Sequence, residues 1–269
     1  MSKSNQRILI GADPEIFLSK DGEFVSAHDL LPGTKIQPFP VAQGAIQVDG
    51  MAAEFNIDPA SSEEEFMSNL DAVLTQLKSM IPTYDFLEKA SVHFTKEFMA
   101  EIPPEALELG CEPDFNAYSK SINKKPEMDR PMRTAGGHIH VGGFESDNPY
   151  ETIHFNQMCR LMQAMDEEVG LYSLAWDKDD ERRSMYGKAG SFRPKSYGAE
   201  YRTLSNAWLF NKKLQSFVYQ GALRAIDKAF SPDWNPSTMV ANIINTSNRE
   251  HNLFKNNKRW DEVNDLLAA

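Results

Sequence analysis

Histidines alternate with apolar side chains in residues 136–143, which read Gly-Gly-His-Ile-His-Val-Gly-Gly. If this run is a β-strand, His138 and His140 share one face of the sheet, and Ile139 and Val141 share the other. The paired glycines leave room for another backbone or a ligand to come close. We therefore expect a strand that lines a cleft. The alternative is a hairpin strand with two exposed histidines, because an H-x-H pair alone is a weak signal.

The first apolar run, residues 7–18, contains two acids around a proline, Asp13-Pro14-Glu15. In an extended backbone the side chains of Asp13 and Glu15 point the same way. Because Pro14 has no N–H, we expect the strand to be interrupted here and to lie at a sheet edge or a bulge. A turn at residues 19–22 then leads to a short returning strand.

A second acidic strand follows further along the chain. Residues 46–48 and 51–57 read as two strands joined by a turn at Asp49-Gly50, and Glu54 lies inside the second strand. Burying a carboxylate among apolar neighbours is costly unless it has a partner. Glu54 is therefore predicted to face a cation.

Helical spacing of apolar residues predicts the scaffold. Ser62 and Glu65 form a capping box before the first apolar stripe, and Met-rich or amphipathic stripes follow the histidine strand. Stripes of this kind belong to a core far more often than to a cofactor site. The predicted helices begin at Ser62, at residues 147–149 and at Ala207, with two shorter ones at residues 235–236 and at Asn248, and residues 91–98 are expected to form another strand.

Two loops carry basic residues, and a third carries a cysteine. Lys35, in the Pro/Gly-rich loop 31–40, could reach a carboxylate or phosphate, although a solvated lysine is the commoner case. Residues 179–193 form an Arg- and Gly-rich loop in an otherwise acidic protein. Cys111, in the polar loop 109–118, could be a nucleophile or simply a small buried residue.

Composition excludes some functions. The formal net charge of −11 argues against nonspecific nucleic-acid binding, because there is no basic surplus to displace phosphate counterions. Two cysteines make no disulfide framework, so a reducing compartment is expected. The polar start is unlike a signal peptide, and no run approaches the roughly 20 apolar residues of a membrane span. We therefore expect a cytoplasmic protein that binds neither nucleic acid nor membrane.

The acidic and basic groups together indicate phosphoryl chemistry. Several carboxylates converge in proteins mainly around hard cations, and Mg²⁺ or Mn²⁺ suits oxygen-rich sites that also hold ligand phosphates. Metal and arginine together neutralise a transferring γ-phosphoryl group. There is no G-x-x-x-x-G-K-[ST] loop and no kinase signature. The candidate residues are Asp13, Glu15, Glu54, His138 and Glu200 with Lys35, Arg183, Arg193 and Arg202.

The order of these motifs resembles a known family. D-P-E on the first strand, D-G and then E-F-N, a glycine-flanked H-I-H, and finally R-S, F-R-P and E-Y-R-T-L-S-N are similar to the carboxylate–amine ligases of the glutamine synthetase-like superfamily. The most similar group is the phage-type COOH–NH2 ligases (type 2). The resemblance runs from Gly11 to Asn206.

The resemblance implies an α+β, glutamine synthetase-like catalytic fold. Its curved antiparallel sheet would carry helices on the convex face and bind ATP with two or three Mg²⁺ (or Mn²⁺) ions on the concave face, with residues 1–269 forming one catalytic domain. The usual first motif is E-x-E, so whether Asp13 binds metal directly or through water is open. The implied metal ligands are Asp13, Glu15, Glu54, His138 and Glu200. The implied nucleotide-phosphate and acyl-phosphate contacts are His140, Arg183, Arg193 and Arg202, and Lys35 and Asp49 could shape the acceptor site.

The implied activity is ADP-forming amide synthesis through an acyl phosphate. Its substrates would be a small-molecule or peptide carboxylate and an amine, in the host cytoplasm if the protein is phage-encoded. Arg193 and Arg202 would hold the phosphoryl oxygens, and Asp49 could take the proton of the amine. One alternative is a metal-dependent hydrolase that uses the H-x-H pair and the acids. Another is a nucleotide- or peptide-binding module with the same fold.

Overall fold

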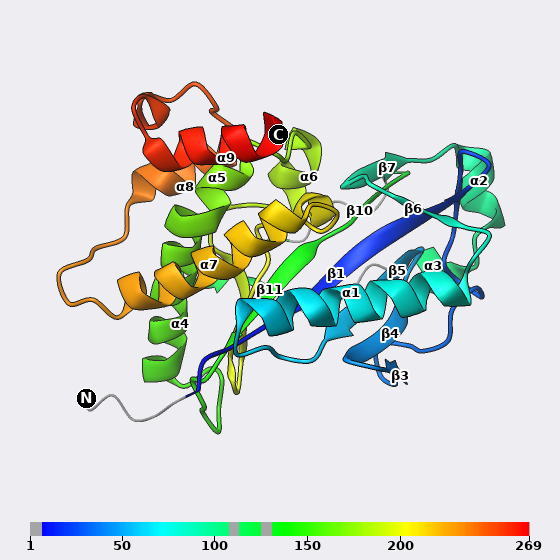
Figure 1. The fold of residues 1–269 in the computed structure, drawn as a ribbon, viewed down its shortest axis with the longest axis horizontal. Helices are drawn as coiled ribbons and strands as arrows, with labels where there is room; N and C mark the ends of the chain where they lie inside the picture. Colours follow the sequence, from blue (N-terminus) through cyan, green and yellow to red (C-terminus); the bar gives the residue numbers. More distant parts are fainter. Residues whose placement is uncertain (1–6, 108–112, 125–130, 269) are drawn as a thin grey trace.

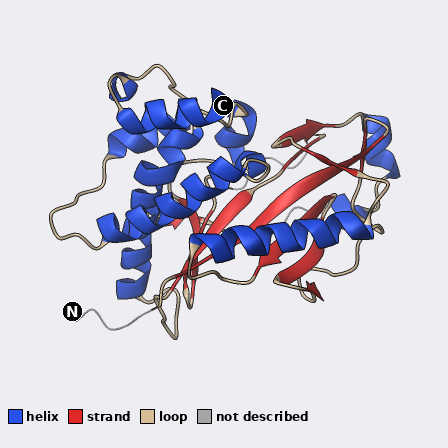
Figure 2. Ribbon diagram, in the orientation of Figure 1, coloured by secondary structure: helices blue, strands red, loops and turns tan. Residues whose placement is uncertain are grey.

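A large antiparallel sheet with its long helices on one side makes this an α+β protein (Figures 1 and 2). The computed structural model describes residues 7–107, 113–124 and 131–268. Along the main path the strand order is β3-β4-β5-β1-β11-β13-β12-β8-β9, and β2 and β6 also pair with β1. The strands are β1 (Leu9–Lys20), β2 (Glu23–Val25), β3 (Phe39–Val41), β4 (Gly44–Asp49), β5 (Ala52–Ile57), β6 (Asp85–Leu87), β8 (Phe115–Asn116), β9 (Ser121–Ile122), β11 (Gly137–Gly142), β12 (Ser191–Lys195) and β13 (Gly198–Tyr201), while β7 (Ser91–His93) and β10 (Met132–Thr134) pair separately.

Strand β1 lies in the interior of the sheet, between β5 and β11. The expectation of an interrupted edge or bulged strand at Pro14 is therefore wrong: β1 runs through it without a break. The amide of Glu15 donates to Gly136 O on the β11 side, and the amide of Ile10 donates to Ala60 O on the other side. Alternation puts the Pro14 nitrogen on the β5 side, where the β1–β5 register begins only at Glu15. The sheet thus accommodates proline where no ladder bond is needed.

The two faces of the sheet differ in chemistry. Ile10, Phe55, Ile139 and Tyr201 are fully buried on the face that packs against helices. Helix α1 (Glu63–Met80) packs against β4 and β5, and α4 (Thr152–Met165) packs against β12 and β13. In Figure 1, α1 crosses the strands near β5, and α7 (Lys212–Ala229) lies between α1 and α4. The opposite face is left for polar side chains.

The predicted capping box is present at the start of α1. Ser62 Oγ accepts a hydrogen bond from the Glu65 amide, and Glu65 Oε2 accepts one from the Ser61 amide. The predicted helix after residues 147–149 begins at Thr152, and it continues through a π-helical turn, Asp166–Gly170, into α5 (Leu171–Ser173).

Other elements differ from expectation. Residues 91–98 form only the short β7 before the chain turns into α2 (Lys96–Glu101), because Thr95 caps a helix there. The basic loop 179–193 contains α6 (Asp180–Met185), capped by Asp179. The helix expected from Ala207 is preceded by a 3-10 turn, Asn206–Trp208, and α7 starts after the cap Asn211. The remaining helices are α3 (Pro104–Leu107), α8 (Thr238–Asn245) and α9 (Lys258–Ala268), with a 3-10 turn at Asn252–Phe254.

Among the described residues, no helix is both long and apolar enough to span a membrane.

Candidate active site

Strand register gathers the predicted residues on one face of the sheet. Residues directly opposite each other in an antiparallel pair point to the same side. That side is the one opposite the helices. The register pairs Asp13 with His138, Glu15 with Glu54, Glu54 with Gln47, His140 with Glu200, and Glu200 with Arg193.

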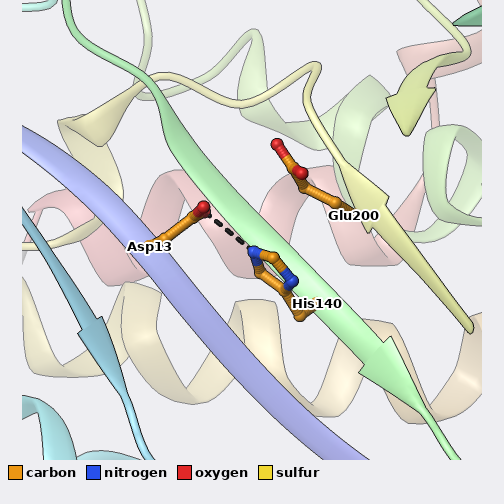
Figure 3. A group of neighbouring side chains, drawn as sticks. All are labelled: Asp13, His140 and Glu200. Carbon is orange, nitrogen blue, oxygen red and sulfur yellow. Dashed lines mark ion pairs between the residues drawn. The ribbon is translucent and has the colours of Figure 1, made fainter. Parts of the chain in front are cut away.

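Asp13, His140 and Glu200 form the first group of ligand atoms, all within 4.8 Å of one another, and we call it the Asp13 group. Figure 3 shows them on β1, β11 and β13, with helices behind the sheet. His140 Nε2 lies 3.0 Å from Asp13 Oδ1. The Nδ1 atom of His138 is also close, 3.4 Å from Asp13 Oδ1 and 3.7 Å from Glu200 Oε1. Both histidines therefore face the same carboxylates.

The Asp13 group fits a divalent cation. Asp13 Oδ1 and His140 Nε2 are buried, and within the described part of the chain neither makes a hydrogen bond of acceptable geometry. Burial raises the pKa of Asp13, but the attraction of His140 and the contribution of His138 together bring the pKa below its usual value. Burial lowers the pKa of His140, and Asp13 raises it overall. An ionised carboxylate pair with one imidazole is a donor set that Mg²⁺ or Mn²⁺ can use.

Positive side chains surround Glu200. Arg202 Nη1 donates a hydrogen bond to Glu200 Oε1, Arg193 Nη1 lies 3.3 Å from the same oxygen, and Lys195 Nζ lies 3.1 Å from Oε2. Burial raises the pKa of Glu200, but Arg202 and His140 bring it well below its usual range. Glu200 therefore stays ionised and draws arginines to the edge of the Asp13 group.

Glu15, Asp49 and Glu54 form a second group of ligand atoms within 4.8 Å of one another, the Glu54 group. Burial and the neighbouring acids, Asp13 foremost, raise the pKa of Glu54 well above its usual value. Burial and Glu15 likewise raise the pKa of Asp49. Lys35 supplies a cation beside this group, because its Nζ lies 2.6 Å from Asp49 Oδ2. Glu54 Oε2 itself accepts a 2.7 Å hydrogen bond from the side-chain amide of Gln47.

The glycines before the histidines allow the close approach that the sequence predicted. A Cβ at Gly136 would lie 2.1 Å from His138 Nε2, and a Cβ at Gly137 would lie 2.2 Å from Ser205 O. The Nε2 side of the His138 ring thus lies against Gly136, and Nδ1 faces the acids. A larger residue at Gly136 would displace the His138 ring, and one at Gly137 would push β11 away from the segment that follows β13.

Two cavities meet at Glu54. The smaller, about 90 Å³, contains five basic side chains and is called the basic pocket. The larger pocket, about 520 Å³, has no lysine or arginine among the described residues that line it. Lining the basic pocket are Lys35, Arg133, Arg182, Arg193 and Arg202, with Glu15, Asp49, Glu54, His138 and Tyr186. Lining the larger pocket are Asp13, Gln47, Glu54, Asn56, Asp58, His140, Glu145 and Tyr197, with Gly11, Gly142 and Gly143.

Arg183 lies away from these cavities, contrary to the role that the sequence suggested. Its side chain is 1% exposed and pairs with Asp177 Oδ2 at 2.9 Å. Its neighbour Arg182 lines the basic pocket instead and donates to three backbone carbonyls, Ala135 O, Thr203 O and Leu204 O. The one-residue difference arises because α6 turns the two side chains to different sides. Cys111 lies outside the described residues.

Arg133 and Arg182 of the basic pocket were missed from the sequence, and so were Gln47, Lys195 and Tyr197. Gln47 alternates with Asp49 on β4 and lies opposite Glu54, so the strand pattern contained a signal for it. Lys195 alternates with Arg193 on β12 in the same way. Tyr197 lies in the turn between β12 and β13, where periodicity carries no information.

Comparison with curated proteins finds no match. A family comparison does find one, over residues 128–240, which include β11, β12, β13 and α4. The family is described as phage phiEco32-like COOH.NH2 ligase-type 2. The matched segment supplies His138, His140, Arg193, Glu200 and Arg202. This segment, which is less than half of the chain, thus matches the same family that the motifs resemble.

Proposed function

We propose that the protein is an ATP-dependent, ADP-forming carboxylate–amine ligase that works through an acyl phosphate. The observation that carries the proposal is the junction of two unlike cavities at Glu54. Acids and His140 line one cavity, arginines gather in the other, and the two acidic groups lie between them. The ligase description of the family supports the same reaction class.

In this proposal the nucleoside of ATP occupies the larger pocket. Its volume of about 520 Å³ suits a base and ribose, and its carboxylates and amide oxygens can accept hydrogen bonds from the amino group of adenine. Three glycines, Gly11, Gly142 and Gly143, let the ligand approach the backbone there. The phosphates then extend past the Asp13 group toward Arg193 and Arg202.

The acid substrate occupies the basic pocket. Its volume of about 90 Å³ admits a small carboxylate or the acidic end of a larger molecule. Five basic side chains favour an anion in this pocket. The carboxylate would thus meet the γ-phosphate from the opposite side, as an in-line transfer requires.

The residues of the Asp13 and Glu54 groups are proposed to hold two divalent ions. When bound, such ions neutralise charge on the phosphates and orient them. His140 belongs to the Asp13 group, so we propose it as the metal-binding imidazole, with His138 beside it near Arg202. This exchanges the roles that the family resemblance implied for the two histidines.

The fixed charges of the site suit acyl phosphate formation. An amine cannot displace oxide from a carboxylate at a useful rate, whereas phosphate is a good leaving group. Arg202 and Arg193 can hold the phosphoryl oxygens as charge moves onto them. Asp49 lies in the pocket of the acid, so it is placed to take the proton of the attacking amine.

At the level of the fold, we propose a glutamine synthetase-like catalytic domain formed by residues 1–269, with the helices on the convex face of the sheet. A central antiparallel sheet with its polar face toward the cavities and its apolar face toward α1 and α4 supports this proposal.

The proposal is tested by incubating the protein with ATP, Mg²⁺ and pools of carboxylic acids and amines. We expect a product lighter by one water than the summed reactants, formed with equimolar ADP and phosphate, by mass spectrometry. AMP and pyrophosphate would contradict the acyl-phosphate route. Products whose summed mass exceeds that of the substrate by one water, formed without ATP, would support a metal-dependent hydrolase instead.

A further inference from the structure

Lys35 sits at the tip of a tightly held loop beside the Glu54 group. Thr34 and Gln37 exchange backbone hydrogen bonds of 3.0 and 3.1 Å around it. Gly33 anchors this turn on β4: its φ is +89°, and a Cβ would lie 2.3 Å from Ile46 O. Only glycine allows both this conformation and this contact. The position of Lys35 is therefore built into the fold.

The ammonium group of Lys35 lies against the acids that are proposed to bind the second ion. Its Nζ is 2.6 Å from Asp49 Oδ2, and the charges of Glu54 and Glu15 also attract it. The acids carry up to three negative charges, and Lys35 supplies one positive charge in the same place. The Lys35 and Asp49 side chains are 43% and 20% exposed, so the pair is accessible to a competing ion from solution.

We propose that Lys35 is an internal counter-ion that competes with the divalent cation for the Glu15–Asp49–Glu54 group. The inference rests on the proposed function, which places a metal ion there. Without metal, Lys35 reduces the repulsion among the three acids. When metal binds, the two cations repel each other and the ammonium is displaced from Asp49.

Displacement gives Lys35 a second role. Lys35 already lines the basic pocket, where the acid substrate is proposed to bind. A lysine released from Asp49 can turn its charge to the substrate carboxylate or to the phosphoryl group. Metal binding would then prepare the pocket for the acid, and the two ligands would strengthen each other's binding.

The test is calorimetric titration of Mg²⁺ and Mn²⁺ into the full chain at low ionic strength, with thermal melts in parallel. Lys35→Met should bind the ion roughly three to ten times more tightly than the wild type, a range expected for a partly buried ion pair. Its melting temperature should be lower without metal and should rise more on adding it. Lys213→Met removes the same charge from an exposed site on α7 and serves as the control.

Lys35→Arg keeps the positive charge, so its metal affinity should stay within about twofold of that of the wild type. If Lys35→Met folds poorly without metal, it can be prepared in Mn²⁺ and titrated with chelator from the folded side. A metal affinity equal to that of Lys213→Met, or weaker, would overturn the inference. Because binding is measured without turnover, a wild type that binds metal but forms no amide would refute the proposed function while leaving this competition intact.

Discussion

The hydroxyl of Tyr197 lies 2.5 Å from His140 Nδ1, on the side of the ring away from Asp13. The two contacts together fix the ring and direct Nε2 at the Asp13 carboxylate. An imidazole that binds metal through one nitrogen usually donates a hydrogen bond from the other, which selects the tautomer. Tyr197 is therefore a positioning residue for His140.

Tyr197→Phe removes the hydroxyl but keeps the aromatic ring at position 197, and it should weaken metal binding. Loss of a partner of this kind typically costs 10- to 100-fold in metal affinity, so the Mg²⁺ concentration for half-maximal turnover should rise at least about tenfold. Tyr150→Phe, at a side chain that is 60% exposed, is the matched control. An unchanged Mg²⁺ requirement in Tyr197→Phe would remove His140 from the metal site.

Glu54→Gln should make the metal-free protein at least as stable as the wild type. The raised pKa of Glu54 means that the fold disfavours its charge, because of burial and then Asp13, Glu15 and Asp49. For a carboxyl whose folded-state pKa is raised, stability falls as pH rises above about 4.5 toward that pKa, and glutamine removes this loss.

Added metal should raise the melting temperature of Glu54→Gln less than that of the wild type, and the variant should lose ligase turnover. This trade of activity for stability is expected of a functional site. Thermal melts with chelator and then with saturating Mg²⁺ measure both effects. A lower melting temperature without metal, combined with an undiminished metal response, would instead indicate a structural role for Glu54.

Arg202→Lys should reduce turnover by about a hundredfold or more. Arg202 contacts Glu200 through Nη1 and has His138 Nδ1 at 3.4 Å, so its planar group bridges the Asp13 group and the basic pocket. Lysine keeps the charge but cannot make two parallel hydrogen bonds to a phosphoryl group. Steady-state kinetics should be compared with Arg224→Lys, at a half-exposed arginine on α7 that pairs with Glu168. Near-normal kinetics in Arg202→Lys would show that its bidentate role is misassigned.

Asp166 should make stability depend on pH without any ligand. It is fully buried in the π-helical turn, accepts a 2.6 Å hydrogen bond from Tyr201 Oη, and burial raises its pKa to about 7. The folded protein thus holds a proton that the unfolded chain releases near pH 4, so stability falls as pH rises from about 4 to about 7. The unfolding free energy lost over this pH range is at most roughly 4 kcal/mol.

Urea unfolding at pH 5 and pH 8 measures the effect, with Asp166→Asn as the comparison. The variant should lose a smaller part of its unfolding free energy between the two pH values. An equal loss in both proteins would assign the pH dependence to other groups.

Local sequence determined the elements of the site but only some of its contacts. The alternation of His138 and His140 with apolar residues required one polar and one buried face, since side chains on a strand alternate. The capping box of α1 and the placement of the Asp13 and Glu15 carboxylates on one side follow from equally local rules. These features depend on neighbours within a few residues, and the structure has them as predicted.

Tertiary structure alone decided which charges meet. Arg182 and Arg183 are adjacent and chemically identical, yet α6 places the first at the basic pocket and the second against Asp177. Lys35 reaches Asp49 because Gly33 packs on β4. Pro14 lies inside the sheet because the β1–β5 ladder starts one residue later. Each outcome depends on strand register and on segments far apart in the chain, which local periodicity and composition do not fix.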